Sequence, residues 1–457
     1  MEEKKEKKLL GIPELTCYGI GNSIGSGIFV SMGVSIGYTG HSITLALALA
    51  CVVVLFAYGY KTIMAGMFAL PGGRYSQAAL LQPPLLVGVS ALSTAFSGLA
   101  FAMYAISIVE YASTVVPEVA QYDKLIEIVI LTLFFATTLL GDKFMGRFNL
   151  IMVVVLIIAL VVYTVVGLPQ VDWATASPAS ENYFYGGPVG LVMAIATMAF
   201  ACQGATFPID MTACAKRPKR SLPIAIILAS AIILVVYCLI GIVSAGILPV
   251  EDVAGKNLGV VAKEIFPYPV FVIFIIGGAC FAIATSLYSA IAGVRYPLLA
   301  TVDDGWLPKF IGLKTKKGYP WVLMLLLYVT SILSIFVDLG LQDLISVMMI
   351  PTMILNTINN VIVVRLIKEY PKAWEKSFFH MPKPAFYLVV AFSTFCSLLI
   401  TLALFTTLDA KGRILILILV VVVFAWCGYR LKANKVNLAD IERAKEEARR
   451  AAEEEEA

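Results

Sequence analysis

The chain has 457 residues, of which 60% are apolar and 14% are charged, and its formal net charge is +4. The mean hydropathy is +0.89, whereas ordinary globular domains carry roughly 25% charged residues. This composition excludes a water-soluble enzyme, a nucleic-acid-binding protein and a disordered scaffold. About twelve spans of ~20 residues would account for the apolar total, so the sequence predicts an all-α membrane protein.

Twelve apolar runs follow one another in chain order, most of them separated by short polar links that contain Pro, Gly or Lys. They predict twelve transmembrane helices, preceded by residues 1–13 and followed by a charged, alanine-rich tail over 432–457. The runs are 14–38, 41–69, 84–113, 125–141, 147–168, 189–213, 222–247, 268–298, 319–337, 342–366, 384–407 and 412–431.

The basic residues predict the orientation. With the N-terminus inside, the inside segments hold 28 of the 34 Lys and Arg residues, the outside loops hold 5, and Lys61 lies within a run. The positive-inside rule then places both termini in the cytoplasm. No signal-peptide pattern is present, and the short loops favour a prokaryotic inner membrane. The sequence leaves a monomer and a homodimer equally open.

Reactive side chains are sparse. The eight cysteines form no Cys-x-x-Cys pair, and the two histidines lie far apart in sequence. This spacing implies neither a disulfide framework nor a metal cluster. No set of nucleophile, base and orienting group stands out in the loops, so the chain is not expected to be an enzyme.

The first apolar run contains a glycine cluster at its middle. Residues 19–29 read GIGNSIGSGIF. Glycines weaken a helix, and the backbone groups that they free are tolerated in a membrane only at a cavity or a bound ligand. Close helix packing through small residues is the structural alternative.

The sixth run has a similar irregularity. Gly204 and Pro208 both disfavour a continuous helix, and Gln203 and Thr206 are polar at membrane depth. Two interrupted helices, five runs apart, indicate a transporter built from inverted repeats. The predicted repeats are 14–168 and 189–366, with helices 11 and 12 at 384–431.

Four landmarks lie in order along the chain, listed here by position: GNSIGSGIF at 21–29, PGGRY at 71–75, Gly204 followed by Pro218, Arg220 and Pro223, and RYPLLATVDDGWLP at 295–308. As a set they resemble the amino acid–polyamine–organocation superfamily, in particular its amino acid permeases. The resemblance implies a LeuT-like five-plus-five inverted repeat and secondary transport of amino acids by alternating access. The chain departs from the family at Cys214, where a glutamate is usual, and at Val155, where some proton-coupled members carry a lysine.

A broken helix suits a zwitterionic amino acid, because amides begin one half of it and carbonyls end the other. We expect the amides to hold the carboxylate and the carbonyls to hold the ammonium, and the resemblance implies the same positions. A small, aromatic and hydroxylated lining favours a neutral side chain, and Ser289 stands where arginine-exchanging relatives have a tryptophan. The predicted substrate-binding residues are Ile24, Gly25, Ser26, Gly27, Ile28, Ser97, Phe101, Phe200, Ala201, Gln203, Gly204, Thr206 and Ser289.

Two further roles remain open. By resemblance, Phe200 is a gate that closes over the substrate, although a packing role explains it equally well from the sequence alone. Sodium is one candidate coupling ion, held by the carbonyls of Gly21 and Ile24 and the hydroxyls of Thr285 and Ser286. A Thr-Ser pair bonded to its own helix is the alternative.

A proton is the other candidate ion, with Lys61, Glu110 or Asp210 as its carrier. Charges within a span cost roughly 2.5–3.5 kcal/mol each, so these residues need partners or water. Lys61 could pair with Asp210 or extend towards the interface. The slight preference is for sodium, and no other cofactor is expected.

Other functions also remain open. The cargo could be a polyamine or another organic cation, although such cargo would leave the amides of 26–28 unpaired. Transport could be exchange, or the same fold could serve as a channel or a substrate sensor. Saturable uptake or exchange in liposomes discriminates between these classes.

Overall fold

The structure is a computed structural model that describes residues 10–70, 73–93, 97–140, 142–180, 183–316, 318–337 and 340–439, together with 442, 443, 445, 446 and 450. These residues form helices and connecting segments, and one isolated bridge joins Leu10 to Ala215. The first half of the chain holds α1 (Ile12–Ser23), α2 (Ser26–Thr39), α3 (Ile43–Ala57), α4 (Gly59–Met67), α5 (Gly73–Leu81), α6 (Pro84–Ser93), α7 (Ser97–Val115), α8 (Asp123–Thr137) and α9 (Asp142–Gly167).

The second half of the chain holds α10 (Gly187–Cys202), α11 (Pro218–Gly246), α12 (Val250–Val253), α13 (Gly259–Ile265), α14 (Tyr268–Ile273), α15 (Phe281–Asp303), α16 (Trp321–Val337), α17 (Leu341–Ile362), α18 (Leu366–Glu369), α19 (Pro371–Glu375), α20 (Lys383–Thr407) and α21 (Ala410–Lys432). The short 3-10 helices are η1 (Gly40–Ser42), η3 (Pro117–Tyr122), η4 (Thr138–Leu140), η5 (Leu168–Gln170), η6 (Gln203–Cys214), η8 (Lys309–Gly312) and η9 (Val363–Arg365). A π-helix, η7 (Phe274–Cys280), leads into α15.

Eight helical stretches in the described part of the chain are long and apolar enough to cross a membrane. Three more apolar helices are shorter, at Pro84–Ser93, Phe101–Val115 and Trp321–Val337. The chain is therefore a multi-pass, all-helical membrane protein. The count of twelve spans and the division into two repeats stay predictions.

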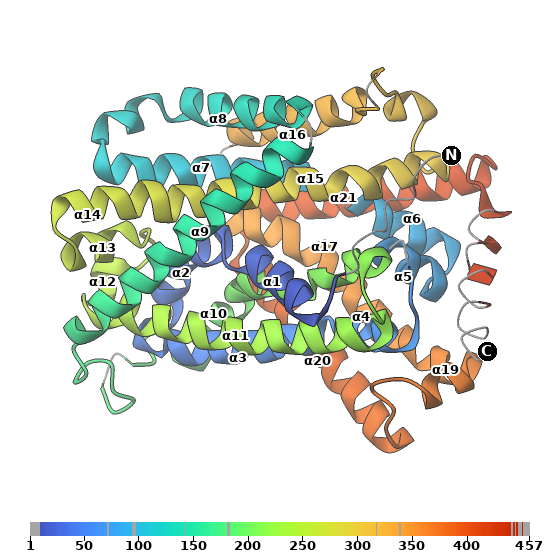
Figure 1. The fold of residues 1–457 in the computed structure, drawn as a ribbon, viewed down its shortest axis with the longest axis horizontal. Coiled ribbons are helices and arrows are strands. Elements are labelled where there is room, and N and C mark those ends of the chain that lie inside the picture. The colour runs from blue at the N-terminus through green and yellow to red at the C-terminus, as the bar shows by residue number, and fades with distance from the viewer. Residues whose placement is uncertain are drawn as a thin grey trace.

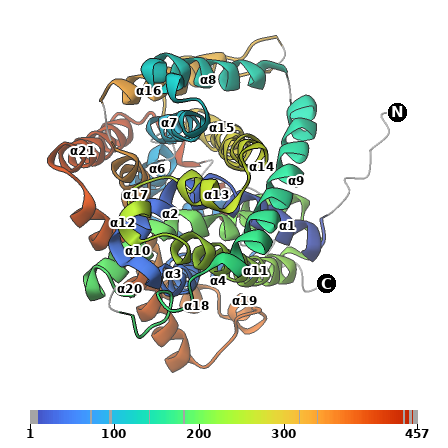
Figure 2. The ribbon, with the colours of Figure 1, turned by 90° about the vertical axis from the view of Figure 1, so that its left-hand side faces the viewer.

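The long helices run roughly side by side along the longest axis of the molecule (Figure 1). Viewed from the end, α2 and α10 lie within the bundle, and α8, α16 and α21 lie at its margin (Figure 2). α2 packs on α10, and α1 packs on both α11 and η6. The two irregular spans that the sequence predicts are therefore neighbours inside the bundle.

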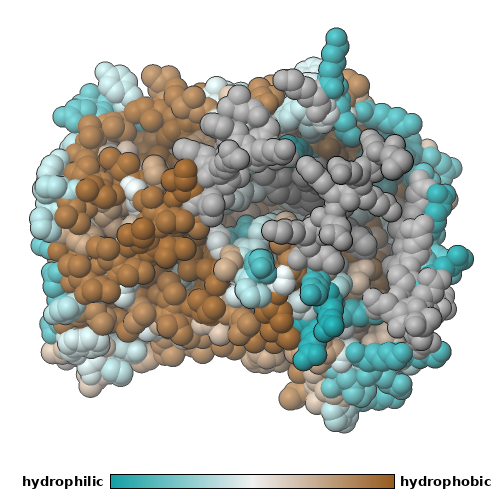
Figure 3. Space-filling model, viewed as in Figure 1, coloured by the Kyte–Doolittle hydropathy of each residue, from teal (hydrophilic) through white to brown (hydrophobic). Residues whose placement is uncertain are grey.

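Large apolar side chains are exposed along several of the long helices, as on a surface that faces lipid. Figure 3 shows hydrophobic residues over much of the face on the left of the view and hydrophilic residues towards its ends. α9 contributes a row of exposed aliphatic side chains to the surface of the molecule: Ile151, Val154, Ile157, Ile158, Val161 and Val165. Exposure of such a row of aliphatic side chains to water would be unfavourable, so these residues indicate that α9 contacts lipid.

Two of the sequence landmarks meet in the fold. The Tyr75 hydroxyl donates a hydrogen bond to the Asp304 carboxylate. Gly305 has a φ of +82°, and a Cβ there would overlap the Lys435 carbonyl. Arg430 and Trp426 of α21 donate to the carbonyls of Gly305 and Trp306, both at 2.9 Å. The loop after α15 is thus held from both sides.

Candidate functional site

The first span is interrupted at the glycine cluster. α1 ends at Ser23, and the amide of Ile24 donates to the carbonyl of Ile20 at 2.7 Å. α2 begins at Ser26, so Ile24 and Gly25 belong to neither helix. The first amides of any helix lack partners within it. The break therefore presents backbone donors at the start of α2, as the sequence predicts.

Three glycines bring the break against other helices. A Cβ on Gly25 would overlap the hydroxyl oxygen of Ser286 in α15, and a Cβ on Gly27 would lie 2.5 Å from the Cα of Ala201 in α10. A Cβ on Gly204 would lie 2.5 Å from the backbone carbon of Asn22. At Gly27 and Gly204 the obstacle is backbone, so only glycine fits there. At Gly25 the Ser286 side chain would have to turn away to admit a Cβ.

The sixth span changes helix type instead of stopping. α10 ends at Cys202, and the chain continues as the 3-10 helix η6 through Pro208. The Thr206 hydroxyl donates to the Gln203 carbonyl at 2.9 Å, and the Thr212 hydroxyl donates to the Ile209 carbonyl at 2.5 Å. These hydroxyls occupy carbonyls that a 3-10 geometry and a proline leave poorly bonded.

Tyr237 of α11 joins the two irregular spans. Its hydroxyl lies 2.6 Å from the Ser23 carbonyl oxygen and 3.2 Å from the Ala201 carbonyl oxygen. The side chain is fully buried. One hydroxyl hydrogen is therefore shared between a carbonyl of α1 and a carbonyl of α10. The sequence analysis missed this residue, although a tyrosine in the middle of an apolar run, away from the interfaces that tyrosines favour, was a signal.

Two further polar groups belong to the same region. The Ser23 side chain is 2% exposed, and its hydroxyl has no hydrogen-bond partner among the described residues. The Tyr58 hydroxyl donates to Oε1 of Gln203 at 2.9 Å, and both residues are buried. Because buried polar groups are nearly always hydrogen-bonded, the Ser23 hydroxyl fits a ligand or water at the break.

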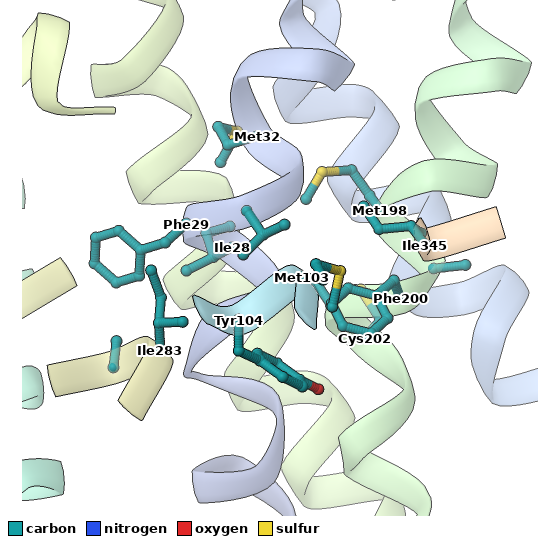
Figure 4. Close-up of a cluster of buried hydrophobic side chains, with 14 of the residues drawn as sticks. Ile28, Phe29, Met32, Met103, Tyr104, Met198, Phe200, Cys202, Ile283 and Ile345 are labelled. Carbon is teal, nitrogen blue, oxygen red and sulfur yellow. The ribbon is translucent and has the colours of Figure 1, made fainter. Parts of the chain in front are cut away.

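The remaining predicted pocket residues are spread more widely. Phe200 is 6% exposed and lies in one buried cluster with Met103, Met198 and Ile345 (Figure 4). The Phe101 ring packs against Phe135 of α8, with centroids 6.1 Å apart. The backbones of Ser26 and Ser97 are described but their side chains lie outside the described part, and Ser289 is half-buried in α15.

The predicted sodium ligands lie on elements that meet, because Gly25 touches Ser286. The Thr285 hydroxyl donates to the Ala282 carbonyl of its own helix at 2.8 Å. Gly21 is different from its neighbours, since a Cβ there would have no atom within 4 Å. No group of three His, Cys, Asp or Glu side chains that could hold a metal ion occurs in the described residues.

The charged residues pair differently from the prediction. Asp210 of η6 pairs with Arg74 of α5, not with Lys61: Nη2 lies 2.8 Å from Oδ2, and Nε lies 3.0 Å from Oδ1. Gly73 has a φ of +57°, and a Cβ there would lie 3.0 Å from the Cα of Asp210. The absence of a side chain at Gly73 therefore lets Arg74 reach Asp210. Lys61 is 5% exposed, and Glu110 is exposed. The two-point contact with Asp210 suits the planar guanidinium of arginine better than the ammonium of lysine.

These features define a class: a multi-pass membrane protein with a broken helix buried inside its bundle. Residues 10–424 match the sequence profile of a family described as amino acid permease. The chain belongs to this amino acid permease family, and it is a membrane transporter that takes a small-molecule substrate.

Two relatives are similar to this chain. "Uncharacterized protein MJ0609" of Methanocaldococcus jannaschii is 25% identical over 349 residues, which cover 73% of this chain and 76% of the relative. The "Methylthioribose transporter" of Bacillus subtilis is 26% identical over 275 residues, which cover 54% of this chain and 57% of the relative. This chain thus matches just over half the length of the Bacillus protein.

Proposed function

We propose that the protein is a secondary transporter that carries neutral L-amino acids across the membrane by alternating access. One observation carries the proposal. The first span stops at Ser23 and restarts at Ser26, directly against Ala201 and Ser286. Donors and acceptors of the main chain are thereby brought together deep in the bundle, where a zwitterion can replace the hydrogen bonds of water.

The carboxylate of the amino acid would bind the amides of Ser26, Gly27 and Ile28. The positive end of the α2 dipole points at this place. The buried hydroxyl of Ser23 would supply one more hydrogen bond. No basic side chain is needed, which agrees with a helix N-terminus as the anion site.

The ammonium would bind on the opposite side, at the carbonyls of Ile24, Phe200, Ala201 and Gln203. Tyr237 already approaches the Ala201 carbonyl, so its phenolic oxygen would share the ammonium. Gly204 would let the two spans close on the substrate. Phe200 would cover it as a gate, and Ser97, Phe101, Thr206 and Ser289 would line the side-chain pocket.

The proposed architecture is a five-plus-five inverted repeat of twelve helices. The repeats would be 14–168 and 189–366, with helices 11 and 12 at 384–431. Both termini, at 1–13 and 432–457, would face the cytoplasm of a prokaryotic cell. The uneven distribution of Lys and Arg residues supports this orientation. The protein would act as a monomer or a homodimer.

Two coupling ions are candidates. Sodium would bind the carbonyls of Gly21 and Ile24 with the hydroxyls of Thr285 and Ser286, since hard cations prefer oxygen ligands. A proton would need a titratable side chain within reach of the substrate site. Exchange without any ion is the third mode.

A ligand screen on the purified protein tests the cargo. A ligand raises apparent stability in proportion to its occupancy. We expect neutral L-amino acids to stabilise the protein, and their decarboxylated amines to bind at least about tenfold worse, because charge-assisted hydrogen bonds to the carboxylate are lost.

Two outcomes of the ligand screen would change the proposed substrate. Equal binding of the amine would favour a polyamine or organic cation. Binding of methylthioribose alone, the cargo in the name of the Bacillus relative, would remove the need for a carboxylate or an ammonium. Binding of amino acids without saturable uptake or exchange in liposomes would indicate a sensor or a channel.

A further inference from the structure

A buried lysine lies close to the proposed substrate site. Lys61 of α4 is 5% exposed. Its ammonium nitrogen lies 4.4 Å from the ring centroid of Tyr58 and 5.9 Å from that of Tyr60. Asp210, the partner that the sequence suggests for Lys61, is bound by Arg74. Lys61 takes part in none of the ion pairs that join described residues.

The surroundings of Lys61 act on its protonated state in opposite directions, and burial is the largest influence. Burial penalises an ammonium that has no carboxylate against it, whereas the faces of two tyrosine rings stabilise a cation. The charges that act on Lys61 come from Arg74 of α5 and Asp210 of η6, which oppose each other. A buried amine beside two aromatic faces, with no carboxylate of its own among the described residues, can gain and lose a proton when its surroundings change.

The other elements packed against α4 bring amides, a hydroxyl and aliphatic side chains to it. α17 presents amides, and Asn360 accepts a hydrogen bond from the Tyr60 amide at 2.9 Å. α20 presents the hydroxyl of Ser393. α11 presents the aliphatic side chains of Leu222, Ala225 and Ile226. Tyr58 and Tyr60 are the titratable neighbours on α4 and at its start.

A short chain of contacts joins Lys61 to the broken helix. Its ammonium faces the ring of Tyr58, and the Tyr58 hydroxyl donates to Gln203 at 2.9 Å. Gln203 is the first residue of η6, and the next residue, Gly204, packs on the backbone of Asn22. A change of charge at Lys61 therefore acts on a tyrosine that holds the start of η6.

We propose that Lys61 is the residue that binds and releases the proton that drives transport, and that Tyr58 and Gln203 link its charge to the substrate site. A proton from water adds to the lone pair of the neutral amine, and the same proton returns to water on the other side of the membrane. No other bond is made or broken. This inference rests on the proposed function, since it names the coupling ion of that transporter.

Two Lys61 variants and a matched control test the proposal in liposomes that contain a pH-sensitive dye. Lys61→Met keeps the length of the side chain without its charge, and Lys61→Arg keeps a charge that cannot be released. The matched control is Lys368→Met, because Lys368 is an exposed lysine of α18. Each variant is assayed for substrate-driven proton movement, for accumulation under a pH gradient and for counterflow of amino acid.

We expect the wild-type protein and Lys368→Met to accumulate substrate up to about tenfold for each pH unit of gradient, the limit for one proton per substrate. Both Lys61 variants should lose the dye signal and the accumulation. Counterflow should remain measurable in them, because no predicted substrate contact involves Lys61. Tyr58→Phe keeps the ring but loses the hydrogen bond to Gln203. We expect it to move protons without a fixed ratio of protons to substrate.

Several results would overturn the inference. One is accumulation by Lys61→Met equal to that of the wild type. Another is wild-type counterflow of amino acid without any proton movement, or with accumulation driven by sodium alone. If Lys61→Met does not purify as a folded protein, Lys61→Arg decides by the same readouts. Absence of amino acid counterflow in the wild-type protein would instead sink the proposed function.

Discussion

The two irregular spans solve the same backbone problem in different ways. The first span stops completely between Ser23 and Ser26, and the carbonyl of Ser23 takes its hydrogen bond from Tyr237, a residue of another helix. The sixth span continues as η6, and Thr206 and Thr212 bond to carbonyls of their own segment. One span leaves backbone groups for a partner, and the other largely satisfies its own.

This difference indicates where ligand contacts are concentrated. A segment that satisfies its own polar groups can rearrange as a unit, but it has few free groups to offer. The first break combines unpaired amides at the start of α2 with a buried, unpartnered hydroxyl at Ser23. We therefore expect substitutions at the first break to affect binding most, and removal of the threonine hydroxyls of η6 to affect it far less.

The largest effect should come from Gly25→Leu or Gly27→Leu. A side chain at either position would collide with Ser286 or Ala201 and fill the space proposed for the carboxylate. Binding should fall by more than about a hundredfold, beyond 2.7 kcal/mol, while the protein still inserts in the membrane. Isothermal titration or uptake measures the loss.

Gly21→Ala is the matched control for these variants. It changes a glycine of the same cluster, but its added Cβ has no atom within 4 Å. Alanine also favours a helix over glycine by roughly 1 kcal/mol, so stability should hold or rise. Unchanged uptake in Gly25→Leu and Gly27→Leu would remove the first break from the site.

Tyr237→Phe should have the next largest effect. It leaves the carbonyls of Ser23 and Ala201 without their shared donor, which costs about 1–3 kcal/mol of stability for buried groups. Binding should weaken by about tenfold, because the ammonium loses a neighbouring oxygen and the two spans lose their common tie.

Tyr163→Phe provides the comparison for Tyr237→Phe. The Tyr163 hydroxyl is also buried, but it lies 3.0 Å from the Ser244 hydroxyl of α11 and so bonds to a side chain instead of a carbonyl of an irregular span. Tyr163→Phe should lower the unfolding temperature by about as much as Tyr237→Phe, without changing substrate affinity. Equal loss of affinity in both variants would mean that Tyr237 only stabilises the fold.

The sequence predicts the first break well because glycine leaves a direct physical signature. Four glycines within nine residues at mid-span disfavour a continuous membrane helix, and the structure interrupts the helix at Ile24 and Gly25. The family could be predicted for a related reason. Gly73, Gly305 and their neighbours form landmarks because close packing and positive φ angles require glycine there.

Other features could not be predicted, because they depend on contacts between distant residues. The sequence suggests Lys61 as a partner for Asp210, and only the fold shows that Arg74 takes that place. Tyr237 stands out in its apolar run, but the two carbonyls that its hydroxyl approaches are known only once α11 is packed on α1. In η6, the same Gly and Pro signal gives a change of helix type, because nearby threonine hydroxyls replace the lost backbone bonds.

Thr206→Val should have a small effect on binding. Its hydroxyl is bonded to the Gln203 carbonyl, so its removal costs about 0.5–1.5 kcal/mol of stability. Valine keeps the methyl group that Thr206 would present to the proposed pocket. Affinity should change by less than about twofold. Thr212→Val, which breaks the equivalent bond further along η6, is the control. A large loss of affinity in Thr206→Val alone would place that hydroxyl on the substrate.

The smallest effect on substrate binding is expected when sodium in the buffer is replaced by another cation. If Lys61 carries the coupling ion, substrate binding should be equal in sodium, potassium and choline buffers, for the wild-type protein and for Thr285→Ala combined with Ser286→Ala. The Thr285 hydroxyl is bonded to its own helix, and the Ser286 hydroxyl oxygen lies against Gly25, so neither needs a cation to satisfy it. A titration of substrate in the three buffers gives the comparison. Sodium-dependent affinity that disappears in the double variant and survives in Lys61→Met would transfer the coupling to the oxygens of Gly21, Ile24, Thr285 and Ser286, and the first break would then bind both substrate and ion.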